Sequence, residues 1–129
     1  MNNLQNDVLE FQKKFDMIEL KGDNKVIQLT EEQKETRITL LKEELKEFIT
    51  ACIEDDIYEQ ADALVDLVYI ALGTSNLMNL PFQELWDDVH KANMRKERGI
   101  KPSRNLKVDV IKPEGWVGPK TEEIIKKYE

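Results

Sequence analysis

Cysteine and histidine are almost absent from this sequence, and long hydrophobic runs are missing. Cys52 is the single cysteine, which excludes a disulfide within the chain. His90 is the single histidine, and we interpret it as a surface or helix-packing residue. No apolar run reaches the roughly 18 residues that a membrane span needs, and the first residues lack the features of a signal peptide. We therefore expect a cytoplasmic protein without membrane contact.

Basic residues are outnumbered by acidic residues. The chain carries 19 lysines and arginines against 26 aspartates and glutamates, a net charge of −7. This balance argues against a general surface for nucleic acids or anionic membranes. A phosphate-bearing ligand remains compatible with it if divalent cations lie between ligand and protein. With 40% hydrophobic residues, the composition is typical of one globular domain, which we expect to cover residues 1–129.

Apolar residues recur at spacings of three and four along most of the chain, which predicts helices. Thr30 is the expected N-cap of the second helix and Gly99 the expected C-cap of the fourth. We predict an all-α fold, a four- to five-helix bundle with an extended C-terminal tail, in which 108–111 alone could form a short edge segment. The predicted helices cover 4–19, 31–54, 57–78, 82–98 and 121–128.

The third predicted helix combines a nearly continuous apolar surface with acidic residues. Residues 61–72, ADALVDLVYIAL, contain ten apolar residues and two aspartates, so we expect this helix to be buried on most faces. Glu59, Asp62 and Asp66 fall within an arc of about 60°. Buried carboxylates are costly unless they are paired or bind a metal, and this helix has no basic residue. The pattern therefore indicates a metal site.

A second acidic group lies on the preceding helix. Glu43, Glu44 and Glu47 belong to the segment EELKE, which alone is typical of a solvated helix face. Because only a few residues join the two helices, we expect an antiparallel pair in which this group faces the acids of the third helix. Carboxylate ligands without histidine or cysteine favour Mg²⁺, with Mn²⁺ as the alternative, over Zn²⁺.

These motifs resemble those of the all-α nucleoside triphosphate (NTP) pyrophosphohydrolases, the group of MazG, phosphoribosyl-ATP pyrophosphohydrolase and the dimeric dUTPases. EELKE at 43–47 is similar to their first motif and EQAD at 59–62 to their second. Many members place the second motif's aspartate directly before a Leu-apolar-Tyr stretch, which here is Asp66, and then Ala63 stands where a glutamate is expected. Either EQAD is the working motif, or Asp66 works with Asp62. Further along, LWDDVHKANMRKERG and KPEGW extend the resemblance over about residues 4–120.

The resemblance implies the fold of this group and hydrolysis between the α- and β-phosphates of a (deoxy)nucleoside triphosphate. Mg²⁺ would orient the attacking water, and Glu44 or Glu47 would be the catalytic base. The nucleotide would contact the end of the fourth helix and the tail. The implied metal ligands are Glu43, Glu44, Glu47, Glu59, Asp62 and Asp66, and the implied substrate-binding residues are Asn93, Lys96, Arg95, Lys112 and Trp116.

Two other functions are compatible with the same residues. The chain could hydrolyse phosphoribosyl-ATP by the same chemistry, or it could be a non-enzymatic helical interaction module whose acids are surface charge. We also expect a homodimer, with a homotetramer as the alternative, because a second copy would cover the apolar third helix.

Overall fold

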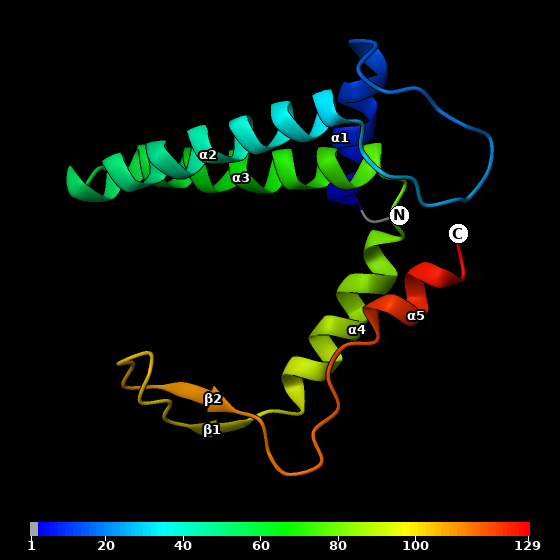
Figure 1. Ribbon diagram of the computed structural model, residues 1–129. Coiled ribbons are helices and arrows are strands. Elements are labelled where there is room, and N and C mark those ends of the chain that lie inside the picture. The colour runs from blue at the N-terminus through cyan, green and yellow to red at the C-terminus, as the bar shows by residue number, and fades with distance from the viewer. Residues whose placement is uncertain (1–2) are drawn as a thin grey trace. The chain divides into compact units, whose positions relative to one another are not determined.

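The computed structural model describes residues 3–129 and contains two compact units, each of which is treated by itself. The first unit comprises the described residues up to Leu80 together with Tyr128–Glu129, and the second comprises Pro81–Lys127. The elements of the first unit are α1 (Asn3–Lys14), α2 (Glu31–Ile53) and α3 (Ile57–Leu77). Those of the second are α4 (Phe82–Met94), β1 (Glu97–Gly99), β2 (Asp109–Ile111) and α5 (Thr121–Lys126) (Figure 1).

This mostly helical architecture confirms the predicted fold class, with one short hairpin added. The extent of the domain stays a prediction. Within residues 3–129, none of the helices combines the length and hydrophobicity that a membrane span requires.

Helices α2 and α3 form the predicted antiparallel pair (Figure 1). Two side-chain hydrogen bonds fix their register: Arg37 Nη2 donates to the Ile70 carbonyl at 2.9 Å, and Gln60 Nε2 donates to the Ala51 carbonyl at 3.3 Å. The turn between them contains Asp55, whose φ of 54° lies in the left-handed region. This register places the middle of α2 opposite the middle of α3.

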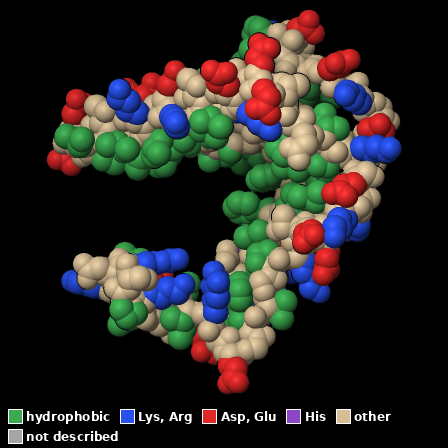
Figure 2. Space-filling view, viewed as in Figure 1, with side chains coloured by type: hydrophobic (Ala, Val, Ile, Leu, Met, Phe, Trp, Pro, Cys, Tyr) green, Lys and Arg blue, Asp and Glu red, His purple; other side chains and the backbone are tan. Residues whose placement is uncertain are grey.

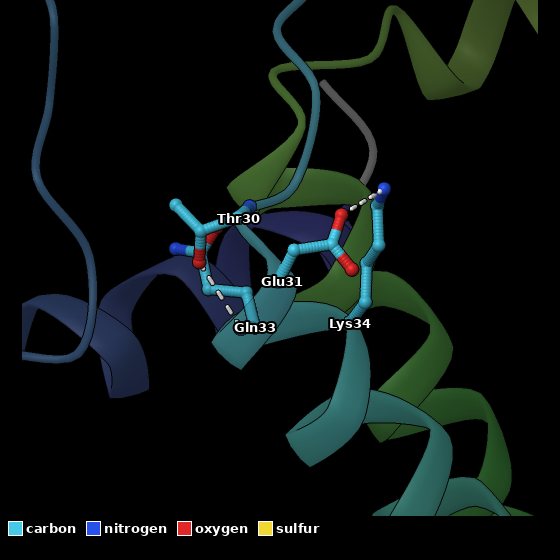
Figure 3. A network of polar contacts seen from close by, with 4 residues as sticks. All are labelled: Thr30, Glu31, Gln33 and Lys34. Atoms are coloured by element: carbon cyan, nitrogen blue, oxygen red, sulfur yellow. Dashed lines mark hydrogen bonds and ion pairs between the residues drawn. The ribbon is translucent and has the colours of Figure 1, made fainter.

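The start of α2 is fixed by a reciprocal cap (Figure 3). Thr30 Oγ1 accepts from the backbone N–H of Gln33 at 3.1 Å, and Gln33 Oε1 accepts from the backbone N–H of Thr30 at 2.9 Å. Lys34 pairs with Glu31 at 2.9 Å in the same turn. These bonds satisfy backbone donors that have no partner inside the helix, and they confirm the predicted N-cap.

Helix α1 packs on α3 through a chain of buried amides. Gln5 Nε2 donates to Asn76 Oδ1 at 3.2 Å, and Asn76 Nδ2 donates to Gln12 Oε1 at 3.0 Å. Gln12 Nε2 donates in turn to the Gly73 carbonyl at 3.0 Å. Val8, which lies between the two glutamines, is also buried. Because buried amides need partners, this network fixes how α1 lies against α3.

Two predicted helix ends are wrong. Helix α1 ends at Lys14 rather than at residue 19, because Asp16 has a φ of 57° and the backbone N–H of Met17 turns back to the Gln12 carbonyl at 2.8 Å. Helix α4 ends at Met94 rather than at residue 98.

Gly99 lies in a strand and is not a helix cap. Strand β1 pairs antiparallel with β2, and Gly99 lies opposite Asp109, which confirms the edge segment expected at 108–111. A Cβ at Gly99 would lie 2.8 Å from Ile111 Cγ2. Glycine therefore allows the close approach of β2 at this position.

The apolar surface of α3 is only partly covered. Ala63 and Leu72 are buried, but Leu64, Val65 and Val68 are 49%, 63% and 51% exposed. Within the single chain α1 and α2 leave one side of α3 open, so the predicted burial on most faces would require a second copy and stays a prediction. Figure 2 shows hydrophobic side chains gathered along the α2–α3 pair on the α3 side.

Candidate metal centre

Three carboxylates meet where the middle of α2 faces the middle of α3. Glu44 and Glu47 are three residues apart on α2 and therefore lie on one face of the helix. Asp66 reaches them from α3. One oxygen atom from each of the three side chains lies within 4.8 Å of the others, and we call this group the acidic cluster. Its spacing allows all three side chains to contact one cation.

The electrostatics of the acidic cluster are those of a site without a countercharge. Glu44 Oε2 is buried and has no hydrogen-bond partner. Burial, then a hydrogen bond with Glu47 and the negative charges of Asp66, Glu47 and Asp62, raise the pKa of Glu44 to about 7. Burial and the charges of Asp62 and Glu47 also raise the pKa of Asp66, and a hydrogen bond with Glu44 opposes this effect. A divalent cation with oxygen ligands would relieve both the burial cost and the repulsion.

The structure distinguishes among the other predicted acids. Asp62 is exposed but close enough for its charge to raise the pKa of Glu44 and Asp66. Glu43 and Glu59 are exposed and are not part of the acidic cluster. Glu59 lines a pocket of about 350 Å³ on the other side of the cluster, which Glu47 also lines. The sequence left open whether Glu59 with Asp62, or Asp66 with Asp62, forms the second acidic motif. The geometry favours the motif that contains Asp66. The roles of all these residues stay predictions.

A cavity of about 400 Å³ opens beside the acidic cluster. Glu44 and Asp66 line one part of it, and Gln12 and Arg37 add polar groups elsewhere. Phe11 and Tyr69 both line the cavity and contact each other edge to face, with ring centroids 5.5 Å apart. The other lining residues are Val8, Met17, Leu40, Ile70 and Gly73.

Gln12 and Arg37, like the two aromatic residues, are absent from the predicted site residues. The sequence holds one signal for Arg37: it precedes Glu44 by seven residues and so lies on nearly the same helix face. For Gln12, Phe11 and Tyr69 the helical pattern indicates only packing. Tyr69 follows Asp66 by three residues on α3 and so lies on nearly the same face. The place of Gln12 and Phe11 beside the acidic cluster depends on how α1 crosses α3, which local sequence does not determine.

The second unit gathers several of the predicted substrate-binding residues around Trp116. Its indole Nε1 donates to the Ala92 carbonyl at 2.8 Å, and Arg95 Nη2 donates to the carbonyl of the adjoining Val117 at 3.2 Å. The ammonium groups of Lys96 and Lys112 lie 5.4 and 5.1 Å from the Trp116 ring centroid, within the range of a cation–π contact.

The fifth predicted substrate-binding residue, Asn93, is exposed in the last turn of α4. Contact of these five residues with a substrate stays a prediction.

A carboxylate cluster beside a mostly apolar cavity indicates a cation site next to a site for an organic ligand. This combination is expected of an enzyme that hydrolyses a phosphate-bearing substrate. Residues 8–93 match the family model described as Phosphoribosyl-ATP pyrophosphohydrolase. The chain belongs to this family, which is part of the all-α NTP pyrophosphohydrolase or MazG-like superfamily, and it is therefore a nucleotide pyrophosphohydrolase. Among curated proteins, none matches the chain.

The family match bears on the predictions in three ways. It contains the acidic cluster, the adjoining cavity and Asn93, but ends before Arg95 and the segment around Trp116. It supports an enzyme over an interaction module. The family's description also favours phosphoribosyl-ATP, the alternative substrate, over the (deoxy)nucleoside triphosphates expected first.

Proposed function

We propose that this chain binds Mg²⁺ through Glu44, Glu47 and Asp66 and hydrolyses a nucleotide between its α- and β-phosphates. The products are the monophosphate and pyrophosphate. The acidic cluster carries this proposal: its carboxylate oxygens lie within 4.8 Å of one another, and a buried oxygen of Glu44 has no partner. Hard oxygen ligands of this kind suit Mg²⁺, with Mn²⁺ as the alternative.

The reaction needs a water molecule, a base and stabilisation of the leaving group. When bound, Mg²⁺ supplies polarisation of the water and neutralisation of phosphate charge. The water oxygen forms a bond to the α-phosphorus, the bond from that phosphorus to the bridging oxygen breaks, and pyrophosphate leaves. Glu44 or Glu47 takes the proton of the water. The resemblance to the MazG group assigns to Lys96 the stabilisation of the negative charge on the departing pyrophosphate, and this role stays a prediction.

The cavity beside the acidic cluster suits the nucleoside part of the substrate. Its volume of about 400 Å³ lies within the range of small-molecule sites. Phe11 and Tyr69 provide aromatic surface for a base, and stacking on such surface tolerates different bases. In the second unit, Asn93, Arg95, Lys112 and Trp116 are the further candidate contacts of the nucleotide.

Two substrate classes follow from these observations. Phosphoribosyl-ATP is supported by the family match, and (deoxy)nucleoside triphosphates are supported by the motifs that resemble the MazG group. The chemistry is the same for both. Pyrophosphate release from phosphoribosyl-ATP, ATP and the natural deoxynucleotides, compared by kcat/KM, separates the two classes.

Pyrophosphate release also tests the metal ligands. Glu47→Gln, Asp62→Asn and Asp66→Asn should each reduce kcat/KM about a hundredfold or more, because each weakens the charge that holds the cation. Glu43→Gln is the matched control, since it removes an exposed carboxylate outside the acidic cluster. Circular dichroism should show unchanged helix content in all four variants. Full activity of Glu47→Gln and Asp66→Asn would refute the proposal, as would wild-type activity that is unchanged when Mg²⁺ is removed.

We further propose a homodimer in which a second copy covers the open side of α3. Leu4 and Val8 of α1 line a groove of about 500 Å³ with Leu64, Val65 and Val68 of α3. Neighbouring apolar side chains that are exposed in the single chain are the surface that a partner copy would cover. Sedimentation velocity should show a dimer, or a tetramer built from it, and Val65→Glu should yield monomers. Leu20→Glu, which changes an exposed loop leucine, is the control. A monomeric wild-type chain would contradict the proposal.

A further inference from the structure

Arg37 is a partly buried cation without a carboxylate partner. It lines the same cavity as Glu44 and Asp66, yet no acidic side chain pairs with it anywhere in residues 3–129. Its Nε donates to Thr74 Oγ1 at 2.9 Å and its Nη2 to the Ile70 carbonyl at 2.9 Å. Both acceptors are neutral, and burial lowers the pKa of the guanidinium. A guanidinium has five N–H donors, so donors remain for a ligand in the cavity.

The position of Arg37 gives the cavity two different ends. On α2, Arg37 precedes Glu44 by seven residues, which is about two helical turns or about 10 Å along the same face. On α3, Gly73 follows Asp66 by the same interval. Because the helices are antiparallel, one end of the cavity holds the carboxylates and the other holds the guanidinium. A nucleoside whose α-phosphate lies near the acidic cluster would extend its base towards Arg37.

Arg37 keeps more unused N–H donors than the neighbouring amide of Gln12. A Cβ at Gly73 would lie 2.8 Å from Arg37 Nη2 and 3.1 Å from Gln12 Nε2, so glycine makes room for both side chains. The amide of Gln12 already has a partner at each end, since it donates to the Gly73 carbonyl and accepts from Asn76. An amide suited to adenine is therefore engaged in the core, whereas the guanidinium still has donors to offer.

We propose that Arg37 determines substrate specificity by donating to an acceptor oxygen on the base side of the bound nucleotide. This inference rests on the proposed function. The carbonyl groups of uracil and hypoxanthine accept from a guanidinium, whereas the amino groups of cytosine and adenine are donors and would face the donors of Arg37. The phosphate of a phosphoribosyl group attached to adenine offers the same chemistry as a carbonyl, namely acceptor oxygens for a guanidinium.

Three pairs of nucleotides test this chemistry. ITP and ATP differ by a carbonyl in place of an amino group, as do dUTP and dCTP, and phosphoribosyl-ATP differs from ATP by the phosphoribosyl group. For each pair we would measure the ratio of kcat/KM. We would also measure the ratio of Kd by calorimetry with α,β-imido analogues in Mg²⁺. Because both members of a pair use the same enzyme preparation, the ratio does not depend on how much of a variant is folded.

The variants are Arg37→Gln, Arg37→Lys and the control Lys42→Gln, which removes an exposed cation of the same helix. Wild type should prefer the member that carries the additional carbonyl or phosphoribosyl group by about tenfold or more. Arg37→Gln should bring that ratio close to one, Arg37→Lys should give an intermediate value, and Lys42→Gln should keep the wild-type ratio. If Arg37→Gln changes the ratio only for phosphoribosyl-ATP and ATP, the acceptor is the phosphate of the phosphoribosyl group. If it changes the ratio only for the other two pairs, the acceptor is the base carbonyl.

Two results would overturn the inference: a wild-type enzyme without preference in any pair, or an Arg37→Gln variant that loses affinity for both members of every pair equally. The calorimetric Kd values test the role of Arg37 separately from the proposed function, because they do not require hydrolysis. If wild type binds the imido analogues with an Arg37-dependent ratio but releases no pyrophosphate, the proposed function fails and the role of Arg37 stands. If hydrolysis occurs but the ratios are the same in Arg37→Gln as in the wild type, the proposed function stands and the role of Arg37 fails.

Discussion

The pH dependence of stability without metal should reveal the cost of burying the carboxylates of the acidic cluster close to one another. The pKa of Glu44 rises from 4.5 to about 7 in the folded chain, first through burial. The folded state therefore binds this proton more tightly than the unfolded state does, and the proton stabilises the fold at low pH. As pH rises from about 4.5 to about 7, that stabilisation is lost, and above this window it no longer changes.

Glu44→Gln isolates this effect, because glutamine keeps the size of the side chain and has no proton to lose. One pKa unit corresponds to about 1.4 kcal/mol, and contact with solvent reduces the effective shift of this partly exposed side chain. We expect the wild type to lose about 1 to 2 kcal/mol relative to Glu44→Gln between pH 5 and pH 8. Asp66, whose pKa is also raised, adds a dependence of the same sign to both proteins.

Urea unfolding followed by circular dichroism in the presence of a chelator measures this difference. Glu43→Gln serves as the control and should keep the wild-type profile, since Glu43 lies outside the acidic cluster. Millimolar Mg²⁺ should stabilise the wild type more strongly at pH 8 than at pH 5, because the cation competes with the proton. A Glu44→Gln profile parallel to that of the wild type would refute the reasoning.

Three further predictions concern the scaffold. Thr30→Ala should lower the free energy of unfolding by about 1 kcal/mol because it removes the cap of α2; an unchanged urea midpoint would contradict this. Gly73→Ala should change the free energy of unfolding by less than about 1 kcal/mol, because its Cβ would meet at 2.8 Å only the flexible end of the Arg37 side chain and alanine favours the helix; a loss of several degrees in melting temperature would show that Arg37 cannot shift. Trp116→Phe removes the 2.8 Å bond to the Ala92 carbonyl and should cost about 1 kcal/mol in thermal unfolding; equal stability would mean that the bond from the Arg95 backbone N–H at 3.3 Å satisfies this carbonyl.

The acidic positions were predictable because their signal is local. Helical periodicity places Glu44 and Glu47 on one face of α2, and a short turn forces α2 and α3 to pack antiparallel. What periodicity left open was which acid of α3 meets them, because Glu59, Asp62 and Asp66 share one arc of the helix. The register fixed by Arg37 decides this in favour of Asp66, and register depends on contacts between helices.

Helix ends and the cavity were harder to predict for related reasons. Apolar spacing continues past Lys14, but Asp16 adopts a left-handed conformation that ends α1. Gly99 was expected to cap a helix, but it instead allows the close approach of Ile111 from the neighbouring strand. This contact joins residues that are twelve positions apart in the sequence. The cavity joins α1 to residues of α2 and α3 far away in the sequence. Such long-range packing leaves no periodic pattern in any one segment.

Binding of Mn²⁺ measured by electron paramagnetic resonance tests most directly whether the acidic cluster is a metal site. The signal of free Mn²⁺ should fall as wild-type protein is added, and Mg²⁺ should restore it by competition. Glu47→Gln and Asp66→Asn should leave most of the Mn²⁺ free, whereas Glu43→Gln should bind it as the wild type does. Undiminished Mn²⁺ binding by Glu47→Gln and Asp66→Asn, or no binding by the wild type at neutral pH, would contradict the account.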